Sequence, residues 1–240
     1  MEIHASLDTA LGFSLAVLED DKVLLQATLP GMGRESDRLL APWLKEQCET
    51  HGVTLSAVRR WTLGIGPGSF AGLRCGIAMV KGIVAVTGAM MRGVPSAYAL
   101  ADQAATAADQ TIGVLHDGRC GQLLLAKFAR VAEGFRLAAA PAPLNPQELL
   151  AEENRCDCYA TAQAETLPEL PPEAAARLRT LPNIDAATLA RAPETLYPWP
   201  ADPAAMEVST EPLYVRPAVF VKPAILKRLE VRGSRLEVRG

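Results

Sequence analysis

The chain has 240 residues, of which 49% are hydrophobic and 21% are charged. This composition can bury a core and argues against an intrinsically disordered protein. The formal net charge of −3 argues against a free-standing nucleic-acid binder, which would carry a basic surplus to neutralise phosphates.

Nothing near the start of the chain predicts export, because residues 1–10 lack a basic segment followed by an apolar one. The five cysteines are odd in number and form no disulfide framework. The longest apolar run, residues 75–91, contains Lys81 and three glycines, so it predicts a buried helix that leads into a strand. We therefore expect a cytoplasmic protein without membrane contact. No metal site is expected either, because the three histidines are far apart in the sequence: His4, His51 and His116.

The first half of the chain predicts three short strands in an antiparallel meander, followed by alternating helices and strands. The predicted elements are, in order, strands at 2–8, 13–19 and 22–28, a helix at 36–51, a strand at 61–66, a helix at 69–87, a strand at 90–94 and a helix at 96–108. Strands that alternate with helices predict crossover connections and a parallel or mixed sheet.

The same order of elements then restarts. The second half comprises strands at 110–117, 121–130 and 134–139, a helix at 145–153, a strand at 156–162 and a helix at 184–192. The proline-rich segments 163–183 and 193–212 are predicted as loops, the first with a short helical turn. Two β-β-β-α-β-α halves predict a duplicated α/β architecture, with domains at 1–108 and 109–215. A basic tail follows at 216–240, in which RLEVRG occurs twice.

A glycine-rich segment, LGIGPGSFAGLRCGIA at residues 63–78, raises the question of phosphate binding. It misses the Walker spacing, because Gly66 and Gly72 are one residue too far apart and Leu73 stands in place of the lysine. It nearly matches the dinucleotide pattern G-x-G-x-x-G/A from Gly66 to Ala71, but no convincing acidic partner for a ribose follows about 20 residues later.

The alternative for this segment is a geometric role. Pro67 would stiffen a strand-to-helix turn, and Ser69 would cap the helix that follows. Gly72 and Gly76 lie one turn apart and would leave a bare stripe for the close approach of another backbone. That approach can occur within the fold or across subunits, and the sequence leaves both open.

Within this segment, GPGSFAGLRCG resembles the signature G-P-G-S-F-T-G-x-R-x-G of the TsaB (YeaZ) family, whose bacterial members are required for the threonylcarbamoyladenosine modification of tRNA. Four further segments resemble family motifs in the same order: ASLDTA at 5–10, RESDRLLAPWL at 34–44, HDGRCGQLLLAKF at 116–128 and EPLYVRPAV at 211–219. The sequence departs from the family pattern at Ala71, Ser36 and Gln122, where the family has Thr, His and Glu.

The resemblance implies a duplicated actin-like, sugar-kinase-like ATPase fold with a degenerate active site, in agreement with the two halves. It also implies a non-catalytic subunit that docks on the catalytic relative TsaD, with TsaE joining the complex. TsaD transfers the threonylcarbamoyl group to N6 of adenosine 37 in tRNAs that read codons beginning with A, so tRNA is an indirect partner. No cofactor is expected on this chain alone, although ATP or ADP can bind at the border with TsaD. A homodimer can use the same surface.

Three sets of residues follow as site candidates. The helices at 36–51 and 69–87 are expected to carry the partner interface, or else to pack only on their own sheet; the candidates are Leu39, Leu40, Trp43, Gly72, Gly76 and Met79. The signature loop comprises Gly66, Pro67, Gly68, Ser69, Phe70, Gly72 and Arg74. A vestigial phosphate site or cleft has as candidates Asp8, Thr9, Asp117 and Arg119, of which the last two can instead form a local turn.

Two enzymatic alternatives are open. A stand-alone actin-fold ATPase or kinase would need a magnesium-binding acid, for which Asp8 is the candidate. A peptidase would need Ser69 or Cys75 as nucleophile with His116 and Asp117 as the base pair. However, Ser69 already has a role as a helix cap, and no G-x-S-x-G elbow is present.

Overall fold

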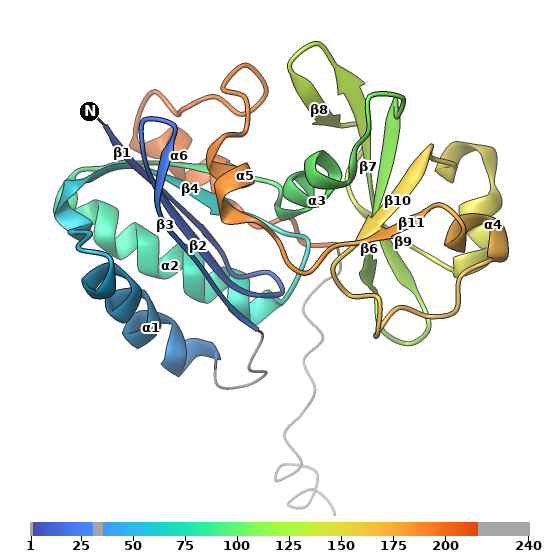
Figure 1. Cartoon of the computed structure of the whole chain (residues 1–240), viewed down its shortest axis with the longest axis horizontal. Coiled ribbons are helices and arrows are strands. Elements are labelled where there is room, and N and C mark those ends of the chain that lie inside the picture. Colours follow the sequence, from blue (N-terminus) through green and yellow to red (C-terminus); the bar gives the residue numbers. More distant parts are fainter. Residues whose placement is uncertain (1, 31–35, 216–240) are drawn as a thin grey trace, which may run out of the picture.

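The computed structural model describes residues 2–30 and 36–215, which form two lobes, each built on one mixed β-sheet (Figure 1). The first sheet has the strand order β3-β2-β1-β4-β5. Its strands are β1 (Ile3–Asp8), β2 (Gly12–Glu19), β3 (Lys22–Pro30), β4 (Val58–Gly64) and β5 (Met90–Val94). The first three form an antiparallel meander, and β4 and β5 continue from β1 in parallel.

The second sheet repeats this topology, with the order β11-β10-β6-β7-β8. Its strands are β6 (Thr111–Asp117), β7 (Leu123–Val131), β8 (Gly134–Leu137), β10 (Cys158–Thr161) and β11 (Leu178–Thr180), with β9 (Ala142–Leu144) added beside β7. Strand β6 takes the place of β1, because it is antiparallel to β7 on one side and parallel to β10 on the other. The predicted duplication of the α/β architecture is confirmed.

Helices α1 (Ser36–Thr50) and α2 (Phe70–Thr87) cover one face of the first sheet (Figure 1). Their apolar stripes pack in one cluster with the strands; it includes Leu40, Trp43, Leu44, Ile77, Val80, Val84, Leu7, Leu15 and Trp61. Pro42 lies inside α1 without ending it. By length and composition alone, α2 is long and apolar enough to cross a membrane, but one side of it belongs to this core.

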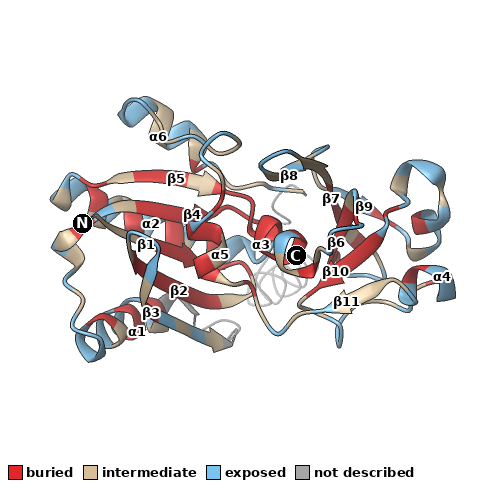
Figure 2. Cartoon of the chain, turned by 45° about the horizontal axis from the view of Figure 1, so that its top comes forward, coloured by how far each residue is buried: buried red, intermediate tan, exposed pale blue. Residues whose placement is uncertain are grey.

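Two short helices are exchanged between the lobes. Helix α3 (Ser96–Ala104), from the first half of the chain, packs beneath the second sheet, whereas α5 (Ala186–Ala190), from the second half, packs on the first sheet. Both are buried where the lobes meet, as Figure 2 shows. Helix α6 (Pro203–Ser209) also returns to the first sheet, beside β5. The packing therefore crosses the domain boundary that the sequence predicts after residue 108.

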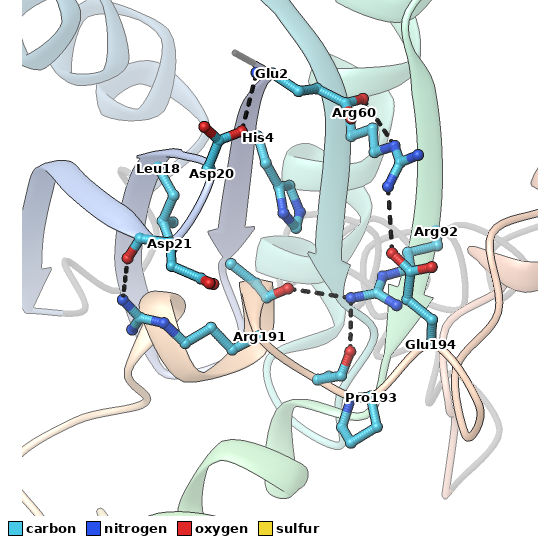
Figure 3. Close-up of a pocket in the computed structure, with 12 residues that line it drawn as sticks. Glu2, His4, Leu18, Asp20, Asp21, Arg60, Arg92, Arg191, Pro193 and Glu194 are labelled. Atoms are coloured by element: carbon cyan, nitrogen blue, oxygen red, sulfur yellow. Dashed lines mark hydrogen bonds and ion pairs between the residues drawn. The ribbon is translucent and has the colours of Figure 1, made fainter.

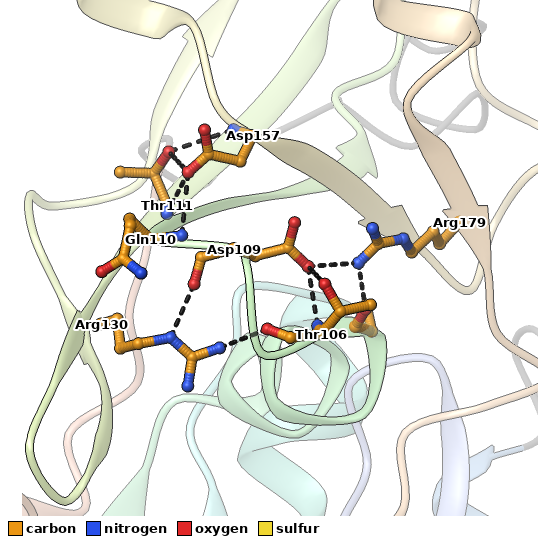
Figure 4. Close-up of polar contacts among 8 residues, drawn as sticks. Thr106, Asp109, Gln110, Thr111, Arg130, Asp157 and Arg179 are labelled. Carbon is orange, nitrogen blue, oxygen red and sulfur yellow. Dashed lines mark hydrogen bonds and ion pairs between the residues drawn. The ribbon is translucent and has the colours of Figure 1, made fainter.

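The connection from α3 to β6 is held by a network of polar contacts (Figure 4). The carboxylate of Asp109 accepts hydrogen bonds from Thr106 N (2.7 Å) and from Arg179 Nη1 (2.6 Å). The Arg179 guanidinium, first among several contacts, lowers the pKa of Asp109 to about 2. Arg130 donates from Nε to the carbonyl of Asp109 (2.6 Å) and from Nη2 to that of Thr106 (2.5 Å). The link between the lobes is thus fixed by charge-assisted bonds.

Three predicted elements are corrected by the structure. The helix expected at 145–153 is replaced by two 3₁₀ turns, η3 (Pro146–Leu150) and η4 (Glu152–Asn154), because Ala151 between them is extended. The loop expected at 163–183 contains strand β11 as well as a short helix, α4 (Pro172–Ala175). The loop expected at 193–212 contains α6, which Asp202 caps. A further 3₁₀ turn, η2 (Leu55–Ala57), precedes β4. The predicted tail at 216–240 lies outside the described residues.

Candidate functional site

The signature loop is a rigid turn between β4 and α2. Gly66 has a φ of +100°, a conformation that favours glycine. Its N–H donates to Ser96 Oγ (2.9 Å), and its carbonyl accepts from Ser96 N (2.8 Å). Ser69 caps α2 by accepting from Gly72 N (3.2 Å), as predicted. Ser69 N also donates to the carbonyl of Ala10 (2.8 Å), which ties the loop to the turn between β1 and β2.

The glycines of the loop and of α2 face that β1–β2 turn. A Cβ added at Gly68 would lie 2.5 Å from Ala10 Cβ, and one at Gly72 would lie 2.3 Å from the carbonyl oxygen of Thr9. At Gly76 the added atom would meet Thr9 Oγ1 at 2.5 Å. Real Cβ atoms essentially never come this close to a neighbour. The bare stripe of α2 is therefore filled by the chain itself.

This placement corrects part of the predicted partner interface. Leu40, Trp43, Gly72 and Gly76 are buried in the chain's own fold. Leu39 and Met79 are half-buried and pack against the same core. The sequence left open whether these residues pack within the chain or against another subunit. In the structure they pack within the chain. A protein that docks on the helix pair could meet Leu39 and Met79 in part, but it would otherwise meet residues outside the predicted set.

Those other residues form the outer face of α2. Its exposed positions are Phe70, Ala71, Arg74, Ala78, Gly82, Ala85 and Val86. Lys81 is half-buried and ion-paired with Glu207 of α6. Apart from Phe70 and these two basic residues, the face consists of small or aliphatic side chains. A Cβ added at Gly82 would have no neighbour within 4 Å, so this part of the helix is open.

An aromatic cluster lies at the N-terminal end of this face. The rings of Phe70 and Tyr214 are 5.0 Å apart, and the Arg74 guanidinium lies 4.6 Å over the Phe70 ring. Arg74 Nε also donates to the Tyr214 hydroxyl (3.1 Å). Phe70 is 40% exposed and Tyr214 is 43% exposed. Tyr214 belongs to one of the segments that resemble family motifs. The contact of Tyr214 with the signature loop joins residues far apart in the sequence and is not predictable from it.

Asp8 is buried and does not present its carboxylate to the solvent. Ser96 Oγ donates to Asp8 Oδ2, and Ala10 N donates to Oδ1 (2.9 Å). Burial raises the pKa of Asp8 to about 6, against these hydrogen bonds, which lower it. Within the described residues, no group of three His, Cys, Asp or Glu side chains is placed to hold a metal ion.

A cavity of about 250 Å³ lies where the lobes meet, and Asp8 is one of the residues that line it. One wall comes from the β1–β2 hairpin and the other from the second lobe; the lining includes Gly12, Phe13, Ser14, Thr28, Ala162 and Asn183. Among residues 2–30 and 36–215, no lysine or arginine lines this cavity. Phosphate binding in proteins relies on backbone N–H groups and basic side chains. The described lining of the cavity therefore lacks the basic side chains that commonly bind a nucleotide's phosphates.

The second hairpin, between β6 and β7, is a tight local turn. Arg119 N donates to Asp117 Oδ1 (2.7 Å), and both Arg119 and Cys120 have positive φ values of 61° and 53°. Asp117 and Arg119 therefore form the local turn that the sequence allowed. Nearby, His116 is buried, and burial lowers its pKa to about 4. His116 Nδ1 is 3.3 Å from Gln163 Oε1, and its Nε2 has no partner in the described part of the chain.

These positions separate the residues of the hypothetical peptidase site. Ser69 lies at the start of α2 on the first lobe, and its hydroxyl is used as a helix cap. His116 is enclosed in the second sheet, with Gln163 as its partner. A general base must lie within hydrogen-bond reach of its nucleophile. Ser69 and His116 do not form such a pair here.

The fold and this site define a duplicated α/β protein whose two hairpins are closed by local contacts. The family model for TsaD, described as tRNA N6-adenosine threonylcarbamoyltransferase, matches residues 31–177. The chain therefore belongs to this family. No curated protein sequence matches the chain.

Solved structures agree with this assignment. The chain is similar to YeaZ from Pseudomonas aeruginosa, with 22% identity, a TM-score of 0.65, and coverage of 89% of this chain and 100% of that one. A second structure from Pseudomonas aeruginosa is titled as an uncharacterized protein with similarity to peptidase YEAZ; it has 23% identity, a TM-score of 0.64, and coverage of 90% and 100%. The family model, together with these structures, confirms the predicted family, and the structures confirm the predicted actin-like fold class.

The close approach of the β1–β2 turn to α2 generates a first prediction. Gly72→Ala should destabilise the protein by about 1–3 kcal/mol, because the new methyl group overpacks against the Thr9 carbonyl. The matched variant Gly82→Ala lies on the same helix in open space and should stabilise it by roughly 1 kcal/mol through helix propensity. Denaturant unfolding measures both. Equal effects of the two substitutions would contradict the contact.

The burial of His116 generates a second prediction. Burial holds the folded-state pKa of His116 at about 4, below its ordinary value of 6.5, so the unfolded chain binds the proton more tightly between these values. This group therefore makes stability fall as the pH is lowered from 6.5 to 4, by up to about 1.4 kcal/mol per pH unit. The difference in unfolding free energy between wild type and His116→Gln should change over this window and be constant from pH 7 to 8. Parallel curves throughout would contradict the buried neutral state.

Proposed function

We propose that this chain is a non-catalytic subunit that docks on a catalytic protein of the TsaD type. It would thereby support formation of N6-threonylcarbamoyladenosine at position 37 of tRNAs that read codons beginning with A. TsaE would complete the complex, and tRNA would be reached through the partner. The membership of the chain in the TsaD family supports the pathway, whereas the docking role is inferred from the surface.

The outer face of α2 is the observation that carries this proposal. Interfaces are depleted of charged residues at their centre and enriched in aromatic residues and arginine. On this helix, Ala78, Gly82 and Ala85 form a small, uncharged strip that allows a partner helix to approach closely. Phe70, Arg74 and Tyr214 lie at one end of the strip and have the residue types of binding hot spots.

A non-catalytic role is supported by the state of the two hairpins. Asp8 accepts hydrogen bonds from Ser96 and Ala10, and no basic residue of the described part of the chain lines the cavity that Asp8 borders. We therefore expect ATP or ADP at the border with the partner and not in the cleft of this chain. When the partner is absent, the same face of α2 would pair two copies of the chain in an isologous contact.

Ala78→Glu tests the docking face. A carboxylate in the middle of the strip would be desolvated without a partner, so affinity for the TsaD-type protein should fall at least about tenfold. Ala139→Glu, an exposed alanine after β8 in the second lobe, is the matched control and should bind normally. Titration calorimetry measures both, and circular dichroism checks that each variant is folded. Unchanged binding of Ala78→Glu would place the interface elsewhere.

Reconstitution tests the proposed role itself. A mixture of the TsaD-type protein, TsaE and tRNA should form threonylcarbamoyladenosine efficiently only when this chain is added, given the threonylcarbamoyl donor. Equal modification without the chain would overturn the assignment. Turnover of magnesium-ATP by the purified chain alone would instead favour the ATPase alternative.

A further inference from the structure

A second cavity of about 280 Å³ lies at the other end of β1, away from the signature loop (Figure 3). This volume lies just below the roughly 300–1,000 Å³ of typical ligand pockets, which is the scale of a small molecule. Its walls come from the start of β1, the β2–β3 turn, β4, β5 and the segment that follows α5. The polar residues that line it include Glu2, His4, Arg60, Arg92, Arg191 and Glu194.

Arg92 forms the inner wall and is only 1% exposed. It donates to Thr62 Oγ1 (3.1 Å) and to three backbone carbonyls; the carbonyls belong to Ala190, Ala192 and Tyr197. A guanidinium has five N–H donors, so these four bonds leave one Nη1–H for another acceptor. No acid of residues 2–30 or 36–215 forms an ion pair with Arg92. Trp199 covers one face of the guanidinium, with the Arg92 Cζ 4.5 Å from the ring centroid, and the charge of Glu194 raises the Arg92 pKa against the effect of burial. An anion in the cavity would add a counter-ion within ion-pair distance.

His4 and Arg191, which also line the cavity, carry no negative charge that could pair with Arg92. His4 Nε2 is 2.9 Å from Thr62 Oγ1, and burial, followed by Arg92 and Arg60, lowers the pKa of His4 to about 3. His4 is therefore a neutral hydrogen-bonding group at physiological pH. Arg191 donates from Nη2 to the carbonyl of Asp21 (2.9 Å) and adds a second guanidinium to the cavity wall.

The rim of the cavity has the opposite charge. Asp20, Asp21 and Glu194 are exposed and line its opening. Arg60 engages Glu2 (2.8 Å) and Glu194 (3.2 Å), whereas no ion pair of the described residues uses Asp20 or Asp21. The cavity thus runs from a buried cation to exposed carboxylates. Leu18, Ala190 and Pro193 supply apolar surface between them.

We propose that this cavity binds a free α-amino acid with a small side chain. The carboxylate would lie against Arg92 and Arg191, and the ammonium group would face Asp21 and Glu194. The apolar residues leave room for a short aliphatic or hydroxylated side chain. Arg92 is pre-organised by its carbonyl contacts, so little side-chain entropy would be lost on binding. This site is separate from the docking face of α2 and does not depend on the proposed function.

Titration calorimetry with the full chain tests this site, using L-alanine and L-threonine as probes. Both should bind saturably, whereas propionate and ethylamine, which each carry only one of the two charges, should bind at least about tenfold more weakly. Arg191→Gln changes an exposed side chain and should weaken L-alanine binding at least about tenfold, and Asp21→Asn should also weaken it. Arg59→Gln removes a neighbouring exposed arginine that does not line the cavity and should bind as wild type.

Three results would overturn the proposal. One is no saturable heat with either amino acid up to about 10 mM. Another is binding of propionate or inorganic phosphate as tight as that of L-alanine, which would define a simple anion site. The third is unchanged affinity in Arg191→Gln with thermal unfolding like that of the wild type, which would move the ligand out of this cavity.

Discussion

The contact between the β1–β2 turn and the bare side of α2 is the constraint on which the first lobe depends. The Thr9 carbonyl lies where a side chain at Gly72 would be, and Ala10 lies where a side chain at Gly68 would be. Ser69 N then bonds to the Ala10 carbonyl, so the helix cap and the hairpin are fixed together. Any side chain at these glycines would push α2 away from the sheet that it covers.

The signature loop has the composition of a phosphate-binding loop. The same contact explains why it packs against the β1–β2 turn instead. Seating the hairpin against α2 brings Asp8 beneath the loop, where Ser96 connects its carboxylate to Gly66. Both oxygens of this carboxylate accept hydrogen bonds from the chain, so Asp8 helps to hold the loop and the hairpin together. The inner side of α2 thus serves the fold, and only its outer side is left for a partner.

The duplicated topology is predictable from the sequence because the order of strands and helices repeats along the chain, a pattern that needs no long-range information. The role of Ser69 as a helix cap is predictable too, because capping is a local property. The neighbour of the glycine stripe is not predictable, because Gly72 and Gly76 produce the same pattern for an internal and an external neighbour. Strand β11 was missed for a related reason: three residues between prolines form a strand only because β10 pairs with them.

The exchange of helices shows why residue 108 divides the sequence but not the core. Helix α5 fits on the first sheet through Ala186, Ala187 and Ala190, and Arg92 of β5 binds the carbonyls where this helix ends. In return, α3 fills the space beneath β6 and β7. Each sheet therefore completes its core with a helix from the other half. A chain cut at residue 108 would leave both apolar faces exposed, so the two lobes depend on each other for stability.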